Sequence, residues 1–281
     1  MYLLVGAHVS ASGGINKSFK RGEEIGADCV QIFVSSPRTW SVKEINEDEL
    51  ELYFDEKKRS KLSPTLVHGK YLISLGSPDK KLLQKSSLAL SKEFSITNKI
   101  GALGLVFHPA SHRGVGFKKI KNQFVDAVNQ TLLDNKGESL LLLETSAGSG
   151  DHIGSNFNEL AELINLVDNK RIGICIDTQH LWASGYDISS HKGLEKTFED
   201  FDQIIGIEKL KAIHLNDSKK EFRSFVDRHE NIGDGYIGYS GIKNFLSRKE
   251  VSNIPIYLEV PGINGGGPDK ENIQRVKNLT S

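Results

Sequence analysis

Eight short runs rich in Val, Ile and Leu recur along the whole chain, and this recurrence is the feature that most constrains its fold. The runs cover residues 3–9, 28–34, 64–68, 103–108, 139–144, 172–177, 210–215 and 254–259. Short runs that are apolar throughout predict strands buried on both faces of a sheet. Between them, apolar residues at helical spacing predict helices over 14–26, 79–99, 117–135, 157–168, about 194–205 and 269–280.

Strands that alternate with helices eight times predict an α/β fold, the (β/α)8 or TIM barrel. A doubly wound open sheet is the alternative, because periodicity alone does not separate the two topologies. No linker or low-complexity tract interrupts the alternation. One α/β barrel accommodates a chain of this length, so we expect residues 1–281 to form a single domain.

Composition sets limits on location and partners. The 36 basic and 36 acidic residues cancel, so net charge alone does not indicate a nucleic-acid partner. Cys29 and Cys175 lie in two different predicted strands, which favours a reducing, intracellular compartment (the cytoplasm in a prokaryote) over a disulfide scaffold. We expect no signal peptide and no membrane association, because no apolar run approaches the roughly 18 residues that a span needs.

Potential metal ligands stand at the ends of six predicted strands. In a barrel of this type the chemistry is carried by residues at the carboxyl ends of the strands. Strands three to eight end at or near a His, Asp or Glu: His68, His108, Glu144, Asp177, His214 and Glu259. A single His at such a position is most often an ordinary hydrogen-bonded residue, but convergence of six ligand types on one face indicates a metal site.

Three more ligand types fall in loops on the same face. His180 follows Asp177 by three residues, and Asp227 and His229 are two apart, so both can point to the same side of an extended segment. The nine candidates comprise five imidazoles and four carboxylates, a mixture that suits zinc, manganese or iron better than calcium or magnesium. Since a catalytic zinc takes about three protein ligands, nine predict two or three ions. We interpret His8, which also ends a strand, as a supporting residue and not a ligand.

These residues lie inside motifs that span nearly the whole chain. The motifs are GAHVSASGG (6–14), SPRTW (36–40), VHGKYLISLGSP (67–78), VFHPASHRG (106–114), LLLETSAGSG (141–150), CIDTQHLWASGYD (175–187), IHLNDSK (213–219), DRHENIGDGYIG (227–238) and LEVPG (258–262). In combination they resemble the endonuclease IV family of apurinic/apyrimidinic endonucleases (AP endonuclease family 2).

The resemblance implies three zinc ions, one of which manganese or iron could replace. The first ion would be held by His68, His108 and Glu144; the second by Glu144, Asp177, His214 and Glu259; the third by His180, Asp227 and His229. Glu144 would bridge two ions, and Glu259 would bind metal and position the nucleophile, which makes these two the predicted catalytic residues. Three such ions would add six positive charges to a chain of zero formal charge.

The function implied by the resemblance is repair of double-stranded DNA. The enzyme would hydrolyse the phosphodiester 5′ to an abasic site, leaving a 3′-hydroxyl and a 5′-deoxyribose phosphate, and would also remove 3′-blocking groups. It would flip the nucleotide out of the duplex. The resemblance points to Arg38, Tyr71 and Leu72 as the residues that fill the gap in the base stack. Without it, Leu72 would be interpreted as a loop anchor and Arg38 as a surface charge. We expect no obligate protein partner.

The sequence makes four departures from the usual family pattern. His68 is followed by Gly69-Lys70 where the family commonly has Ala-Pro, and Gln179 stands where Cys is usual. Asp234 stands where Glu is common, and Val260 where Thr is common. None of these departures removes a ligand.

The sequence leaves two rival functions open. The main rival is a metal-dependent sugar isomerase or epimerase of the xylose isomerase-like barrel type, which would use only Glu144, Asp177, His214 and Glu259. A catalytically inactive nucleic-acid-binding barrel is the other.

Overall fold

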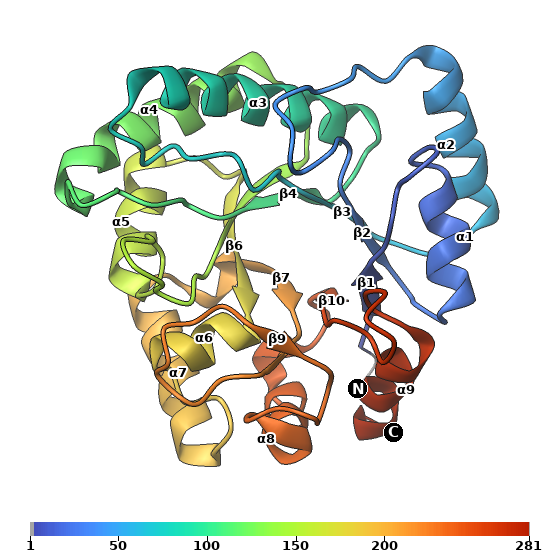
Figure 1. The fold of residues 1–281 in the computed structure, drawn as a ribbon, viewed down its shortest axis with the longest axis vertical. Helices are drawn as coiled ribbons and strands as arrows, with labels where there is room; N and C mark the ends of the chain where they lie inside the picture. Colours follow the sequence, from blue (N-terminus) through green and yellow to red (C-terminus); the bar gives the residue numbers. More distant parts are fainter. Residues whose placement is uncertain (1–2, 281) are drawn as a thin grey trace.

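In the computed structural model, which describes residues 3–280, eight parallel strands close into a barrel surrounded by helices (Figure 1). The barrel strands are β1 (Val5–His8), β2 (Val30–Ile32), β3 (Thr65–His68), β4 (Gly104–Phe107), β5 (Leu140–Glu144), β6 (Ile172–Asp177), β7 (Leu210–His214) and β10 (Ile256–Leu258). Each lies within one of the eight predicted runs. The ends of the predicted domain, residues 1, 2 and 281, lie outside the described residues.

The strand order closes the barrel and rules out the open sheet. Neighbours in sequence are neighbours in the sheet, and β1 pairs with both β2 and β10, with Val5 opposite Ile256. The barrel interior is filled by buried side chains from six strands and from Cys29, which directly precedes β2. The six are Leu66, Val106, Leu142, Cys175, Ala212 and Tyr257. The two cysteines are free thiols, as their placement on separate strands predicts. The (β/α)8 prediction is confirmed.

The helices that the sequence predicts are present, and several begin where a capping residue stands. They are α1 (Lys17–Glu24), α3 (Lys80–Lys99), α4 (Phe117–Asp134), α5 (Phe157–Val167), α7 (His191–Ile204) and α9 (Lys270–Thr280). Asp79 caps α3 by accepting the backbone N–H groups of Lys81 and Leu82, and Asn156 caps α5 by accepting that of Glu159. Side-chain caps of this kind satisfy the free N–H groups of a first helical turn.

Three helices are absent from the predictions: α2 (Glu47–Arg59), α6 (Thr178–Ser184) and α8 (Gly238–Leu246). In α2 only Tyr53 is buried, so its charged sequence carries too narrow an apolar stripe to register as amphipathic. Its start is nevertheless marked by a capping box formed by Asn46 and Glu49. α6 follows β6 without a loop, and it carries His180.

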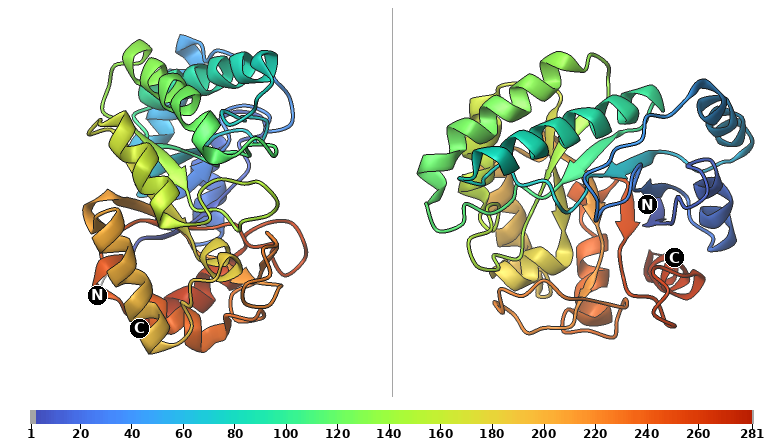
Figure 2. Two further views of the ribbon diagram at one scale, coloured as in Figure 1. Left: turned by 90° about the vertical axis from the view of Figure 1, so that its left-hand side faces the viewer. Right: turned by 45° about the horizontal axis from the view of Figure 1, so that its top comes forward.

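The two-stranded hairpin β8 (Asp217–Ser218) and β9 (His229–Glu230) lies outside the barrel, after β7. It presents His229 beside the carboxyl ends of the strands, where the loop that precedes it also places Asp227. Two further views show the helices on the outside of the strands (Figure 2). Among residues 3–280 no helix combines the length and the apolar character that crossing a membrane requires.

Candidate metal centre

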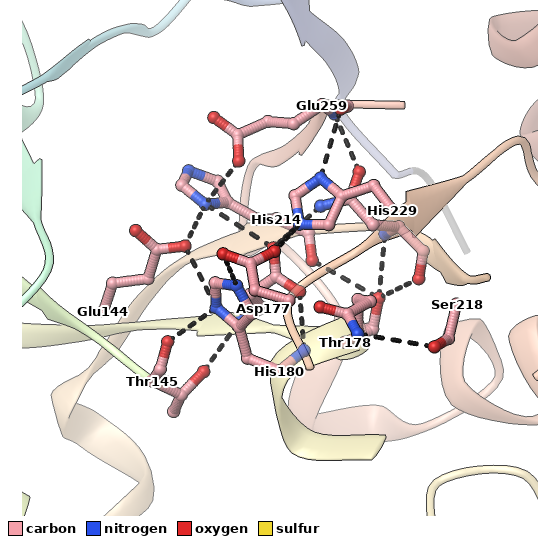
Figure 3. Close-up of polar contacts among 12 residues, drawn as sticks. Glu144, Thr145, Asp177, Thr178, His180, His214, Ser218, His229 and Glu259 are labelled. Atoms are coloured by element: carbon pink, nitrogen blue, oxygen red, sulfur yellow. Dashed lines mark hydrogen bonds and ion pairs between the residues drawn. The ribbon is translucent and has the colours of Figure 1, made fainter. Parts of the chain in front are cut away.

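The barrel brings all nine predicted ligands together at the carboxyl ends of its strands. His68, Glu144, Asp177 and His214 are the last residues of their strands, and His108 and Glu259 directly follow β4 and β10. α6 supplies His180, and the segment around β9 supplies Asp227 and His229. Figure 3 shows the side chains of Glu144, Asp177, His180, His214, His229 and Glu259 gathered about one space.

Glu144 lies at the centre of this cluster and is fully buried. Its Oε2 is 3.4 Å from Nε2 of both His68 and His108. Its Oε1 is 2.9 Å from Nδ1 of His214 and 3.5 Å from Nδ1 of His180. One carboxylate therefore contacts four imidazoles from four different elements, which is the position a bridging ligand would need.

The other contacts divide between the barrel mouth and the hairpin. His214 Nδ1 is 3.3 Å from Glu259 Oε2 and 4.0 Å from Asp177 Oδ2. Asp227 lies between two imidazoles, with Oδ2 3.3 Å from His180 Nε2 and Oδ1 3.5 Å from His229 Nε2. His229 Nε2 also lies 3.6 Å from Asp177 Oδ2.

Ligand atoms that lie within 4.8 Å of one another form three groups, and the groups share members. They are His68, Glu144, His214 and Glu259; His108, Glu144 and His180; and Asp177, His180 and His229. This grouping pairs His68 with His214, whereas the resemblance pairs it with His108. Because the groups overlap, the division of the nine residues among individual ions stays a prediction.

The histidine rings are oriented by their second nitrogen, as metal-binding histidines are. Nδ1 of His68, His180 and His229 lies 2.7, 2.7 and 3.2 Å from the backbone oxygens of Gly69, Thr145 and Glu259. A carbonyl only accepts, so each Nδ1 carries the proton and Nε2 is left as the free nitrogen facing the cluster. His214 is reversed: its Nε2 lies 2.7 Å from Gln31 Oε1, which leaves Nδ1 toward Glu144.

Three atoms of the cluster are buried without a hydrogen-bond partner in the described chain, and they indicate whether these residues fit metal ions. Within the described residues, Glu144 Oε2, His180 Nε2 and His229 Nε2 are buried and make no hydrogen bond. Buried polar atoms in proteins are normally paired. Unprotonated imidazole nitrogens beside carboxylate oxygens are the ligand atoms that zinc takes in proteins. The donor set therefore fits divalent ions of the zinc type.

The electrostatics of the cluster favour a cation. Burial opposes ionisation of Glu144, but His108 and His214 outweigh it and hold the pKa of Glu144 well below its usual range. Burial likewise opposes ionisation of Glu259, whose pKa is nevertheless lowered by His214 and His8. Burial would lower the pKa of His180, but Asp177 and Asp227 raise it to about 10. The carboxylates are therefore held in the charged form that binds a cation, and neighbouring imidazoles carry balancing positive charge until a metal displaces their protons.

Two buried amides position the predicted ligands, and the sequence interpretation missed both. Gln31 donates from Nε2 to Glu259 Oε1 over 2.6 Å in addition to its contact with His214. Asn216 donates to Asp177 Oδ2 over 2.7 Å and accepts the backbone N–H of Glu259 over 2.9 Å. A lone amide inside the apolar run DCVQIFV is the signal that could have identified Gln31. His8 supports the same group, with Nδ1 3.3 Å from Glu259 Oε1.

A cavity of about 500 Å³ opens beside the cluster. Its lining includes three predicted ligands, His108, His180 and Asp227, and also Tyr71 and Leu72. His152, for which the sequence offers no partner, lines it as well. A cavity of this size at the barrel mouth has room for a sugar-phosphate unit next to the cluster.

Tyr71 and Leu72, two of the three predicted DNA-contacting residues, line this cavity, and the three side chains differ in exposure. Tyr71 is 60% exposed, Arg38 is exposed and Leu72 is half-buried. The ring centroids of Tyr71 and Phe33 are 5.4 Å apart, so the two loops that follow β2 and β3 are in contact. Arg38 does not line this cavity, although its neighbour Trp40 does. An exposed aromatic side chain is not a core anchor, and Tyr71 is available for contact.

Comparison with known proteins places these features in a family. A family model described as "Xylose isomerase-like TIM barrel" matches residues 19–279. A probable endonuclease 4 of Halothermothrix orenii is 42% identical over 268 residues, 95% of this chain and 96% of that protein. A probable endonuclease 4 of Thermosipho melanesiensis is 40% identical over 278 residues, 98% of this chain and 97% of that protein.

Among solved structures, endonuclease IV from Thermus thermophilus superposes with a TM-score of 0.86 at 27% identity, covering 98% of each chain. A 3-keto-D-glucoside 4-epimerase from E. coli superposes with a TM-score of 0.70 at 14% identity, covering 99% of each chain. The second match shows a shared fold and nothing about activity.

Proposed function

This chain belongs to the endonuclease IV family, and from that premise we propose that it is a DNA-repair endonuclease that depends on a multinuclear zinc centre. It would hydrolyse the phosphodiester 5′ to abasic sites in duplex DNA, leaving a 3′-hydroxyl and a 5′-deoxyribose phosphate. Removal of 3′-blocking groups uses the same phosphodiester chemistry at a strand end. We further propose that residues 1–281 act as one domain, inside the cell, where the DNA substrate is found.

The observation that carries the proposal is the joining of nine ligand side chains into one cluster through Glu144. A sugar epimerase that used Glu144, Asp177, His214 and Glu259 would leave the remaining ligand types without a role. His180 and His229 are nonetheless oriented by backbone carbonyls and have buried, unpartnered Nε2 atoms. That arrangement supports more ions than an epimerase of this kind uses.

Zinc ions held by the nine residues would supply positive charge to polarise the phosphate and would lower the pKa of a water molecule. The chain's own residues do the rest. Glu144 fixes the positions of four histidine side chains relative to one another, because its two carboxylate oxygens contact all four imidazoles. Glu259, fixed by Gln31 and by the Asn216 contact to its backbone, presents a carboxylate that can orient the attacking water.

The raised pKa values of the two cysteine thiols agree with hydrolysis that forms no covalent enzyme intermediate. Cys175 lies inside the barrel, and burial raises its pKa to about 11. Burial also raises the pKa of Cys29 strongly. Neither cysteine offers a thiolate at neutral pH, so neither can serve as a covalent nucleophile, in agreement with the proposed hydrolysis by water.

The experiment that tests the proposed function is incubation with a duplex that carries one abasic analogue. We expect a single cut 5′ to the lesion and no cut in the matched undamaged duplex. The rival function is tested on the same preparation, which is incubated with free ketoses while chromatography monitors their epimerisation. Epimerase activity without cleavage of the abasic duplex would contradict the proposal.

His229→Ala tests the number of ions. We expect the native protein to contain two to three equivalents of zinc, or of zinc with manganese, and the variant to lose about one equivalent, since a zinc site seldom survives with two ligands. The barrel should stay folded, because His229 lies on the hairpin and not in the barrel. Metal analysis by mass spectrometry measures the loss, with His191→Ala, an exposed histidine at the start of α7, as control. One equivalent or none in native protein would contradict a trinuclear centre.

Replacing both Tyr71 and Leu72 with Ala tests DNA contact. Filling the gap left by a flipped nucleotide offsets unstacking, which costs about a few kcal/mol, so binding and cleavage of the intact abasic duplex should weaken. An abasic site beside a nick is already flexible and should lose less. Zinc content should not change. The comparison is measured as kcat/KM on the two substrates.

Leu133→Ala removes an exposed leucine on α4, away from the site, and is the matched control. Equal loss on both substrates together with a lower Tm would show that Tyr71 and Leu72 stabilise the fold and do not enter the duplex. Selective loss on the intact duplex supports the predicted role.

A further inference from the structure

Lys70 is a lysine that the fold buries completely between two loops at the rim of the site. Its side chain is 0% exposed. Its Nζ donates to the backbone oxygens of Thr39 and Ser41, over 3.0 and 3.1 Å, and lies 3.6 Å from Glu93 Oε1. Lysine is almost never fully buried unless it is paired, and here three acceptors surround the ammonium group.

Glu93 of α3, equally buried, extends this network to both loops. Its Oε2 accepts the backbone N–H of Lys70 over 3.1 Å. Its Oε1 accepts the hydroxyl of Ser35 at the start of the loop that follows β2. The Lys70–Glu93 pair therefore holds Ser35, Thr39 and Ser41 from one loop and the backbone of the other.

Besides the Lys70–Glu93 contacts, the loop over residues 35–41 is anchored by Trp40, which packs against the hydrophobic core. It contains no helix or strand, and in the described chain its one backbone–backbone hydrogen bond between its own residues joins Thr39 N to Ser36 O over 3.5 Å. Exposed Arg38 directly precedes Thr39, and exposed Tyr71 directly follows Lys70. The contact between Lys70 and Thr39 therefore joins the direct neighbours in sequence of Tyr71 and Arg38, two of the predicted DNA-contacting residues.

We propose that Lys70 is a positioning residue for damaged-DNA recognition: its ammonium group fixes the carbonyls of Thr39 and Ser41 and so sets the spacing between Arg38 and Tyr71 before DNA binds. The inference rests on the proposed function. A loop that is already ordered loses less conformational entropy on binding, so affinity for the duplex gains from this contact.

A simpler role for Lys70 would be to neutralise buried Glu93, and paired variants separate the two roles. Lys70→Met keeps the length of the side chain but leaves a buried carboxylate unpaired, which destabilises a protein strongly. Adding Glu93→Gln removes that charge and keeps an amide whose oxygen can accept the backbone N–H of position 70 while its NH2 group donates to the hydroxyl oxygen of Ser35. The double variant therefore lacks only the tether to Thr39 and Ser41.

We expect Lys70→Met to lower the Tm and the double variant to regain most of it. In the double variant, KM for the intact abasic duplex should rise about tenfold while kcat changes by less than about threefold. The reason is that the untethered loop becomes ordered only when DNA binds, and this ordering costs binding free energy. Zinc content should match that of the native protein. A Tm, KM and kcat all equal to those of the native protein would show that Lys70 only neutralises Glu93.

Amide hydrogen exchange supplies a readout that needs no DNA. In the double variant, peptides covering residues 36–42 should exchange at least about tenfold faster, while peptides of α5 exchange at the native rate. Lys43→Met, which removes an exposed lysine from the same region, is the control and should leave these rates unchanged. If the native protein failed to cut the abasic duplex, the proposed function would fail, and the exchange rates would still test the tether.

Should the double variant not fold, Lys70→Leu with Glu93→Gln also lacks a donor at position 70 and allows the same comparison. Native exchange over 36–42 in a folded variant without the ammonium group would overturn the proposal.

Discussion

Glu144→Gln is expected to slow cleavage of the abasic duplex by about 1,000-fold or more, the upper range for loss of one electrostatic catalytic group. Glu144 contacts four imidazoles at 2.9 to 3.5 Å. Gln keeps the shape but removes the negative charge that would bridge two ions. We therefore expect the variant to lose metal as well as activity, and the assay is single-turnover cleavage alongside metal analysis.

Glu138→Gln is the matched control, because Glu138 is exposed and precedes the opposite end of β5. It should cleave at the native rate. A Glu144→Gln variant that kept its full metal content and more than about a tenth of native activity would exclude a bridging role for Glu144.

Glu259→Gln is expected to slow cleavage by about 100-fold or more, while DNA binding changes much less. The carboxylate lies 3.3 Å from His214 and 2.6 Å from Gln31, so the substitution leaves the contacts that fix the side chain largely in place. What it removes is the charge that would hold metal and orient the attacking water. Cleavage rates at saturating enzyme separate this effect from binding.

Glu271→Gln serves as the control for a loss of negative charge without contact to the cluster, because Glu271 is an exposed residue of α9 that pairs with Arg275. Turnover close to that of the native protein in Glu259→Gln would refute the role assigned to Glu259. A lower Tm with parallel losses of binding and turnover would show that Glu259 mainly stabilises the barrel mouth.

The fold could be predicted because two local signals agree. Each barrel strand is a short apolar run, and most of the gaps between runs show helical spacing. The gaps 35–63 and 216–253 do not, and the unpredicted helices α2 and α8 lie in them. Six of these strands then end at or near a His, Asp or Glu, and parallel closure brings all such ends to one face. The meeting of His68 with Glu144 and His214 follows from topology alone once the barrel is assumed.

The sequence patterns do not predict which residues from distant segments contact one another. Gln31 meets Glu259 across 228 positions, and nothing local to either residue indicates that partner. The overlap of the ligand groups depends on side-chain orientation, which periodicity does not encode. Lys70 stands out in the sequence only as a departure from a motif; its role depends on a loop that precedes it by about thirty residues.

The measurement that tests the central claim most directly is cleavage of a single-abasic duplex before and after prolonged chelation, with metal content determined on the same samples. We predict that cleavage falls in step with the loss of two to three metal equivalents and returns when zinc is restored, because the nine ligand residues need the ions to act on a phosphate. Cleavage that persists in protein shown to be free of metal would contradict the account.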